Sequence, residues 1–385
     1  MTGRILFIDQ SGQPGGAELC LTDVAAHFRK QSRVLLFSPG PFEEILRSRE
    51  VPVSVLEAPR RLASINKSAA VRDYLGALPE LSGFLGSLRK EIRAADLIYL
   101  NTAKALLHGV VAGSGLRKPT VFHLHDLLSP DHFSRLNIRL ITMAANRTGA
   151  VIANSRATAQ AFREAGGKVP VHVIPNGFDP ARFAALPGDE VLALRREFSA
   201  GAAPVAAVFG RIARWKGQDV LLRAAARIPE LRVWIVGAAF FTGDDHRYAA
   251  ELQELAASPE LAGRVSFAGQ REDVPGLMQA ADLIVHSSVA AEPFGRVVVE
   301  GMLSRRPVLA SASGGPLEMI RNGVTGGLVP PGDTGAMEAA LRNILRMPDR
   351  GRKMGLLASA DATQQYSLSA ILKQTNHVLS GLLPS

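Results

Sequence analysis

The chain has 385 residues, 47% hydrophobic and 21% charged, which is typical of two globular domains that each bury a core. The single cysteine, Cys20, excludes an internal disulfide framework and favours a reducing compartment. No apolar run approaches the roughly 18 residues that span a bilayer, and residues 5–8 are too short a run for a signal peptide, so we expect a cytoplasmic protein.

The first predicted strand covers residues 4–8 and ends at Asp9. The loop after it contains Gly15 and Gly16, and a predicted helix then runs to Lys30. A strand, a glycine-rich loop and a helix form an arrangement that can hold phosphates, although a tight turn also needs glycine. Neither this loop nor the rest of the chain has the dinucleotide fingerprint, which disfavours a nicotinamide-dependent dehydrogenase.

Strand and helix patterns alternate through the first 175 residues, which predicts a doubly wound parallel sheet. The turn-forming residues 173–180 then close a first lobe. We place the lobes at residues 1–180 and 190–365. The further predicted strands of the first lobe cover residues 34–37, 53–56, 97–100, 120–123, 150–153 and 171–174.

Almost all of the formal charge of +9 lies in the first lobe, because residues 1–175 hold 22 Lys and Arg against 14 Asp and Glu. The excess suggests an anionic partner, namely lipid headgroups, a phosphorylated acceptor or nucleic acid, or else a solvated surface. Nucleic acid is the weakest choice, since no helix-turn-helix, zinc or RNA-recognition signature accompanies the charge.

The long connection at residues 58–93 combines basic and apolar side chains at helical spacing. A helix of this kind can lie on a membrane surface, but more often it is a core helix with a solvated face, which we favour. Its basic residues are Arg60, Arg61, Lys67, Arg72, Arg89, Lys90 and Arg93, and its apolar ones are Leu85, Leu88 and Ile92.

The strand at residues 120–123 leads into His125 and Asp126. Its polar end therefore lies at the carboxyl edge of the sheet, where open α/β sheets bind ligands. His123 shares the face of His125, so either histidine could be the one that contacts a ligand. No further Asp or Cys stands at ligand spacing, which argues against a metal site.

The second lobe opens with a strand at residues 204–209 and a loop from Gly210 to Gly217. The loop carries Arg211 and Lys216, two cations that can clamp a diphosphate. Arg214 reads as a solvated charge. Further strands are predicted at residues 233–236, 265–267, 281–285 and 307–310.

Two carboxylates, Glu292 and Glu300, stand eight positions apart around Phe294 and Gly295. Glu292 lies on the loop before a predicted helix, and Glu300 lies about one turn into it on the face of Arg296. Amides near Gly295 form an anion site, and a carboxylate beside it should bind a neutral polyol instead. The simplest ligand that combines phosphates with neutral hydroxyls is a nucleotide sugar, so these residues predict a nucleotide-sugar site.

The motifs of the second lobe, taken together, resemble the retaining glycosyltransferases of family four. They comprise residues 265–278 with Arg271, the segment from Glu292 to Glu300, residues 313–318 and residues 323–333. The resemblance implies the GT-B architecture, in which two Rossmann-like lobes face each other across a cleft. It also implies an acceptor-side first lobe, a donor-binding second lobe and a final helix at residues 366–385 that packs on the first lobe.

The resemblance also assigns roles to residues. It implies that His125 contacts the transferred sugar, Glu292 its hydroxyls and Glu300 the ribose. It implies that Gly15 and Gly16 face the donor diphosphate, which Arg211 and Lys216 bind. The donor-binding set that we take from it is Gly15, Gly16, Arg211, Lys216, Arg271, Glu292, Phe294, Gly295 and Glu300, and the catalytic set is His125, Glu292, Arg211 and Lys216.

These parts predict hexosyl transfer from a nucleoside-diphosphate sugar to a hydroxyl acceptor such as a glycolipid, a polysaccharide intermediate or a small metabolite. Side-chain cations stabilise the leaving group, so we expect no metal and no other cofactor. No carboxylate is a strong candidate nucleophile. This favours attack by the acceptor hydroxyl on the same face of the sugar from which the leaving group departs. The alternatives are a nucleotide-sugar epimerase of the same architecture and a non-catalytic nucleotide-sugar-binding protein.

Overall fold

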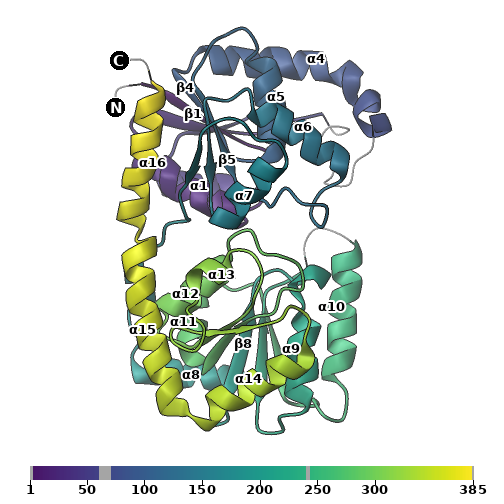
Figure 1. Cartoon of the computed structure of the whole chain (residues 1–385), viewed down its shortest axis with the longest axis vertical. Coiled ribbons are helices and arrows are strands. Elements are labelled where there is room, and N and C mark those ends of the chain that lie inside the picture. The colour runs from purple at the N-terminus through teal and green to yellow at the C-terminus, as the bar shows by residue number, and fades with distance from the viewer. Residues whose placement is uncertain (1–2, 60–70, 240–242, 384–385) are drawn as a thin grey trace. The chain divides into compact units, whose positions relative to one another are not determined.

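The computed structural model describes residues 3–59, 71–239 and 243–383, without the side chains of residues 71–80. The chain divides into two compact units (Figure 1), one formed by Met1–Gly177 with Leu368–Ser385 and the other by Phe178–Ser367. Each unit is a parallel sheet covered by helices on both faces, which confirms the predicted pair of Rossmann-like lobes.

The first unit contains a seven-stranded sheet with the order β3-β2-β1-β4-β5-β6-β7, in which every pairing is parallel. Its strands are β1 (Ile5–Asp9), β2 (Ser32–Leu36), β3 (Val53–Val55), β4 (Leu97–Leu100), β5 (Thr120–Leu124), β6 (Ala150–Ala153) and β7 (Val171–Val173). Its helices are α1 (Gly16–His27), α2 (Pro41–Ser48), α4 (Val71–Arg93), α5 (Ala103–Ala112), α6 (Arg135–Ala145), α7 (Arg156–Glu164) and α16 (Leu368–Leu382).

Alternate residues of the first-unit strands enter two separate cores. Leu6 and Ile8 of β1 pack with residues of α4 to α7, whereas Ile5 and Phe7 pack with residues of α1, α2 and α16. Because both faces of the sheet are covered, the inner strands β1, β4 and β6 are buried along their whole length, whereas the edge strands β3 and β7 are partly exposed. Helix α16 lies against α1 (Figure 1), so the end of the chain is part of the first unit.

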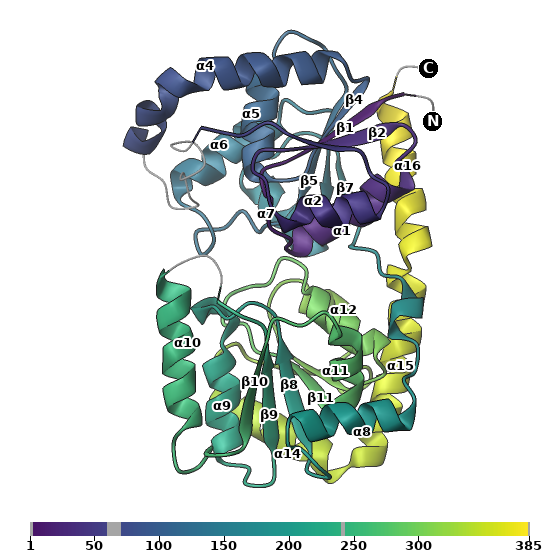
Figure 2. The ribbon, with the colours of Figure 1, turned by 180° about the vertical axis from the view of Figure 1, so that it is seen from behind.

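The second unit contains a six-stranded parallel sheet with the order β10-β9-β8-β11-β12-β13 (Figure 2). Its strands are β8 (Val205–Phe209), β9 (Arg232–Val236), β10 (Val265–Gly269), β11 (Leu283–His286), β12 (Val308–Ser311) and β13 (Gly327–Val329). Its helices are α8 (Gly188–Glu197), α9 (Gln218–Ala226), α10 (Gly243–Ala256), α11 (Val274–Ala280), α12 (Arg296–Leu303), α13 (Pro316–Met319), α14 (Thr334–Arg346) and α15 (Pro348–Tyr366), with 3₁₀ turns at Pro180–Phe183 and Arg214–Lys216.

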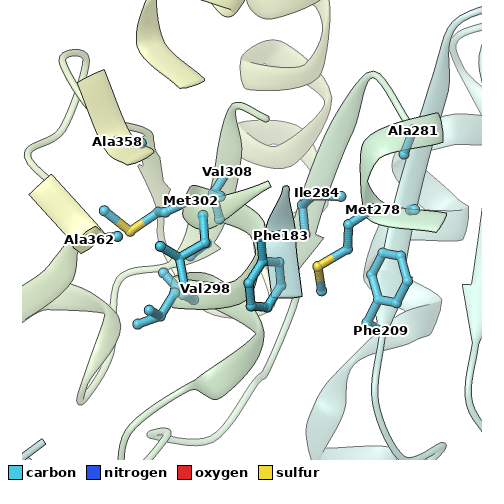
Figure 3. Packing of buried hydrophobic residues seen from close by; sticks show 14 of the residues in the cluster. Phe183, Phe209, Met278, Ala281, Ile284, Val298, Met302, Val308, Ala358 and Ala362 are labelled. Atoms are coloured by element: carbon cyan, nitrogen blue, oxygen red, sulfur yellow. The ribbon is translucent and has the colours of Figure 1, made fainter. Parts of the chain in front are cut away.

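Helix α12, which follows Gly295, is anchored by its apolar face. Val298 and Met302 are fully buried, and Met302 extends toward Ala358 and Ala362 of α15 (Figure 3). Each such side chain stabilises the fold by about 1.5–3 kcal/mol relative to an exposed one. The packing therefore holds the amino end of α12 in one place, which matters for the residues just before it.

Helix α4 distinguishes between the two interpretations of residues 58–93, a helix on a membrane surface and a core helix with a solvated face. Leu88 and Ile92 are buried in the first-unit core, and Arg89 donates hydrogen bonds to backbone carbonyls of Ala112 and Ser114. The core-helix interpretation is confirmed for this part, because the apolar face is already covered. Arg60, Arg61 and Lys67 lie outside the described residues, as does the side chain of Arg72.

Candidate active site

The candidate donor site lies where two neighbouring strands of the second sheet end. Strands β8 and β11 are adjacent, but the chain crosses from one to the other by way of β9 and β10, so the strand order reverses between them. Open α/β sheets bind ligands at such a switch point, at the carboxyl ends of the strands. The loop after β8 carries Arg211 and Lys216, and the loop after β11 carries Glu292.

Lys216 and Glu292 form an ion pair in this site. The Lys216 Nζ lies 2.6 Å from the Glu292 Oε2, and the side chains are 19% and 11% exposed. The same Oε2 accepts hydrogen bonds from the His286 Nε2 at 3.1 Å and from the Ser288 hydroxyl at 3.2 Å. Since a carboxylate can only accept, the proton of the His286 ring is on Nε2.

The environment keeps Glu292 ionised. Burial would raise the pKa of its carboxyl, but the Lys216 ammonium and the hydrogen bond from His286 outweigh burial and hold that pKa well below its usual range. Lys216 has three N–H donors, of which Glu292 engages one, so its ammonium retains the capacity to bind an anion as well. The pair therefore places a carboxylate, which can bind hydroxyl groups, next to a cation, which can bind phosphate.

The loop that carries Lys216 folds back on the end of β11. Gly217 has φ of 62°, and a Cβ on it would lie 2.3 Å from the carbonyl oxygen of Ser287. The Ser287 hydroxyl donates to the carbonyl of Lys216 at 2.9 Å. Glycine is required both for the left-handed backbone and for this close approach, which brings Lys216 within reach of Glu292.

The Glu292 loop in turn is fixed by the glycines at 314 and 315. The Gly315 N–H donates to the Glu292 carbonyl at 2.8 Å, and Gly314 forms an isolated parallel bridge with Glu292. A Cβ on Gly314 would lie 2.1 Å from the Glu292 carbonyl oxygen, and one on Gly315 would lie 2.0 Å from that of Phe294. Only glycine permits these two segments to touch.

Helix α12 begins directly after this loop, with Gly295 as its N-cap at φ of 97°. Glu300 accepts a hydrogen bond from Arg296 at 3.3 Å, which confirms that it lies one turn into the helix on that face. The Phe294 ring is buried against Phe178 and Tyr366, so its side chain is part of the core. A donor contact of Phe294 is thus left to its backbone.

Arg211 and Arg271 differ in what their guanidinium groups contact. Arg211 follows β8 and lies 5.9 Å from the ring centre of Trp215, against which Lys216 also packs. Arg271 follows the edge strand β10 and bonds to Asp273 at 2.8 Å and Glu197 at 2.7 Å. Arg271 must exchange carboxylate partners to reach a phosphate, and its donor-binding role stays a prediction.

The first unit brings together a second group of polar residues at the ends of β1, β4 and β5. Asn101 lies between two of them, since its Nδ2 donates to Asp9 at 2.6 Å and its Oδ1 lies 3.0 Å from the His125 Nε2. His125 and Asp126 line a cavity of about 30 Å³. His123 is buried and bonded to the Tyr99 hydroxyl, which leaves His125 as the more accessible of the two histidines.

Two buried carboxyls in this group have raised pKa values. Burial raises the pKa of Asp9 to about 6, against hydrogen bonds from Asn101 and backbone amides that lower it. Burial, followed by the nearby charge of Asp9, raises the pKa of Glu18 to about 8. Glu18 is the third residue of α1 and lies against Gly15, where a Cβ would come within 2.7 Å of its Oε2. Gly16 is exposed at the first turn of the same helix.

Comparison with known proteins shows which family has this arrangement. Residues 194–358 match the family model for glycosyl transferases group 1, and residues 14–182 match the one for glycosyltransferase family 4. The crystal structure of Anabaena Alr3699/HepE in complex with UDP-glucose is 37% identical, covers 98% of this chain and 100% of its own, and has a TM-score of 0.90. The chain belongs to the group 1, family 4 glycosyltransferases.

Curated relatives of this glycosyltransferase match over shorter segments. D-inositol 3-phosphate glycosyltransferase of Nocardia farcinica is 38% identical over 200 residues, which are 50% of this chain and 43% of that protein. The lipopolysaccharide core biosynthesis glycosyltransferase LpsE of Rhizobium meliloti is 29% identical over 214 residues, 54% of this chain and 58% of that protein. The chain thus spans about half the length of the curated relatives it matches.

Four residues of this glycosyltransferase site had no role in the sequence-based prediction. His286 and Ser288 bond to Glu292, while Asp9 and Asn101 lead to His125. All four share a signal that was available, because each is a polar residue at the end of an apolar parallel strand or within two residues after it. What was missing is the pairing. Asp9 and Asn101 stand 92 positions apart, and the short loop that returns Glu292 to His286 and Ser288 carries no local pattern that predicts the contact.

Gly314→Ala should damage the glycosyltransferase by displacing the Glu292 loop. The new Cβ would collide with the Glu292 carbonyl oxygen, and φ of 69° disfavours any side chain. We expect a loss of roughly 2–4 kcal/mol in the free energy of unfolding, measured by urea titration, with most of the donor turnover lost. Gly323→Ala is the control, because φ is 77° there but nothing lies within 4 Å of its Cβ. Equal stability losses in both variants would show that the contact with Glu292 is unimportant.

Proposed function

We propose that the protein transfers a hexosyl group from a nucleoside-diphosphate sugar, with UDP-glucose as the first candidate, to a hydroxyl acceptor with retention of configuration. The observation that carries the proposal is the Lys216–Glu292 ion pair at the switch point of the second sheet, beside the amino end of α12. It supplies a phosphate-binding cation and a hydroxyl-binding carboxylate side by side. The UDP-glucose complex of the Anabaena protein, 37% identical over nearly the whole chain, supports this choice of donor.

The residues divide the work according to where charge develops. Cleavage of the bond between the sugar C1 and the phosphate oxygen leaves negative charge on the diphosphate and positive charge on the sugar ring. Lys216, Arg211 and the backbone amides near Gly295 stabilise the leaving diphosphate, which is usually the largest contribution to catalysis of this kind. Glu292 binds sugar hydroxyls, Glu300 the ribose and His125 the transferred sugar.

Retention follows from the same-face route. The acceptor oxygen forms its bond to C1 on the side from which the diphosphate leaves, and the departing phosphate oxygen takes the acceptor proton. Double displacement would need a carboxylate free to attack C1. Glu292 is poorly suited to that role, because its Oε2 is engaged by Lys216, His286 and Ser288. NMR of the product's anomeric proton distinguishes retention from inversion.

The donor is tested with a panel of nucleotide sugars, scored by thermal shift and by slow donor hydrolysis. UDP-glucose should raise the melting temperature and be hydrolysed, because water can replace the acceptor. Binding without any hydrolysis or transfer would favour a non-catalytic nucleotide-sugar-binding protein. Interconversion of the sugar while it remains on the nucleotide would identify an epimerase. No response to any member of the panel would contradict the donor site itself.

Activity should survive removal of divalent metals. The charge on the leaving diphosphate is met by Lys216 and Arg211, and no group of three His, Cys, Asp or Glu side chains at metal-binding spacing occurs among residues 3–59, 71–239 and 243–383. We expect the rate of UDP-glucose hydrolysis to be unchanged by EDTA. A rate that falls in EDTA and returns when Mg²⁺ or Mn²⁺ is added would refute metal independence.

We propose that the basic first unit binds an anionic or lipid-linked acceptor. We also propose that it makes peripheral contact with an anionic membrane surface. Arg135 and Arg139 of α6 and Lys168 line a shallow hollow of about 400 Å³, together with the exposed Met143. None of these three cations has an ion-pair partner among the described residues. Within the part of the chain that the structure describes, no helix is long and apolar enough to cross a bilayer. A cytoplasmic location stays a prediction.

Membrane contact predicts salt-sensitive co-sedimentation with vesicles that contain phosphatidylglycerol and little with neutral vesicles. Screening shortens the Debye length from ~10 Å at 0.1 M salt to ~3 Å at 1 M, so binding should disappear at high salt. The Arg135→Ala, Arg139→Ala double variant should bind less, whereas Arg352→Ala, an exposed arginine of α15, should bind normally. Binding that ignores lipid charge, or none at all, would leave a non-membrane acceptor.

A further inference from the structure

Asn101 is buried among groups that determine which way its side-chain amide points. Its Nδ2 lies 2.6 Å from the Asp9 Oδ2 and 3.3 Å from the carbonyl oxygen of Ala17. The other carboxyl oxygen of Asp9 already accepts from the Ser11 N–H at 2.8 Å. A carboxylate and a carbonyl can only accept, so the atom facing them must be the NH₂ group of Asn101.

The orientation of Asn101 then determines the proton position on His125. With NH₂ turned to Asp9, the Asn101 oxygen faces the His125 Nε2 at 3.0 Å. An amide oxygen can only accept, so Nε2 must carry a proton, and in the neutral ring Nδ1 carries the lone pair. The backbone of His125 is held separately, because its carbonyl accepts from the Asn154 side chain at 3.3 Å.

We propose that Asp9 and Asn101 are positioning residues that hold His125 as its Nε2–H tautomer, so that Nδ1 accepts a hydrogen bond from a sugar hydroxyl. The inference rests on the proposed function for the identity of the sugar. It goes beyond that function by assigning a direction to the contact, since a neutral His125 in this tautomer accepts from a substrate at Nδ1 and cannot donate to it. It also gives a role to the buried carboxylate of Asp9, which the transfer chemistry does not otherwise use.

A second histidine packs against the His125 ring. The His123 ring centre lies 3.8 Å from that of His125. Burial, and then repulsion from the His125 ring whenever that ring is protonated, hold the pKa of His123 well below its usual range, so His123 stays neutral. Asp126 is the adjacent residue, Glu18 lies near Asp9, and Tyr99 is bonded to His123, so these three are further titratable groups of the cluster.

The tautomer can be measured on the full-length chain without any substrate. Long-range ¹H–¹⁵N spectra of histidine-labelled protein separate protonated from unprotonated ring nitrogens, and a His125→Asn variant identifies the signals of His125. In the wild type we expect a protonated Nε2 and an unprotonated Nδ1. A proton on Nδ1 in the wild type would overturn the proposal, whatever the kinetics show.

Two variants then test the chain of hydrogen bonds. Asn101→Ala removes the acceptor for Nε2–H, so His125 should become a mixture of tautomers and kcat for UDP-glucose should fall roughly tenfold, the size of one lost hydrogen bond. Asp9→Asn keeps the shape but lets the Asn101 amide turn over, so the Nδ1–H form should appear beside the wild-type form. It also keeps the test available if Asn101→Ala does not fold.

The matched control is Gln160→Ala, which removes an amide of the same unit. Gln160 is exposed on α7 and donates to the Glu164 carboxylate at 2.7 Å. It should leave the His125 signals and kcat unchanged. If Asn101→Ala lowers kcat while His125 keeps its wild-type pattern, the residue has only a structural role and the proposal fails. If the wild type has the expected tautomer but no sugar nucleotide is turned over, the proposed function fails and the orientation of His125 stands.

Discussion

Lys216→Ala is expected to lower kcat for donor turnover by on the order of 10²-fold, the effect of removing one preorganised charge stabiliser. Arg211→Ala, from the same loop, should have an effect of similar size. Lys216→Ala should in addition destabilise the fold, because the pair with Glu292 is largely buried and its loss leaves the carboxylate without a counter-ion. Removing one partner of a buried ion pair typically costs about 3–5 kcal/mol.

The stability loss in Lys216→Ala should depend on pH in a defined direction. In the wild type the folded pKa of Glu292 lies below the unfolded value near 4.5, so the pair contributes stability above that value and loses it as the pH falls through the folded pKa. Without Lys216, burial raises that pKa, and the variant loses stability as the pH rises through it. Urea unfolding near pH 7.5 and at about pH 5 should show the larger difference from wild type at the higher pH.

Arg214→Ala separates this effect from a general loss of positive charge in the loop. Arg214 lies two residues before Lys216 and pairs with Glu251 at the surface, where both side chains are more than half exposed. Exposed pairs contribute about 0–1 kcal/mol, so turnover and stability should change little. Near-normal kinetics in both Lys216→Ala and Arg211→Ala would place the donor phosphates elsewhere.

Much of the fold could be predicted because parallel strands covered on both faces are continuous apolar runs. Five-residue runs such as those of β1 and β8 were therefore visible in the sequence, with bounds that differ by a residue or so. Strand β13 was not predicted, since Gly327–Val329 is short, begins with glycine and closely follows the turn at residues 323–325. Its place in the sheet comes from pairing with β12, which no local pattern reveals.

The site was predictable residue by residue but not as a set of contacts. Glu292 and Lys216 were assigned to the sugar and to the phosphates separately, whereas the structure joins them across 76 positions of sequence. Asp9 and Asn101 are 92 positions apart and carry no motif. For Phe294 the sequence predicted a donor contact within the binding motif, but its ring packs in the core against Phe178 and Tyr366.

Glu292→Ala should abolish transfer, whereas Glu300→Ala should chiefly weaken donor binding. Glu292 lies on the loop before α12 with its charge held by Lys216 and His286, where we propose that it binds the sugar near the reacting carbon. Glu300 lies a turn further along, paired with Arg296, where we propose that it binds the ribose. A contact far from the reacting bond acts on ground state and transition state alike, so its loss raises KM, by roughly tenfold, with little change in kcat.

Glu292→Gln refines the test, because glutamine keeps a hydrogen-bond acceptor but removes the negative charge. Lys216 then has no carboxylate partner, so its ammonium should bind the diphosphate more tightly while kcat remains low. Steady-state kinetics with UDP-glucose, together with donor affinity from calorimetry, separate these effects. Glu338→Ala is the control. This carboxylate lies on α14 and forms ion pairs with Arg227 and Arg342, so its loss should alter neither kcat nor the donor affinity. Equal increases of KM in Glu292→Ala and Glu300→Ala with kcat untouched would show that the two carboxylates do not divide sugar from ribose.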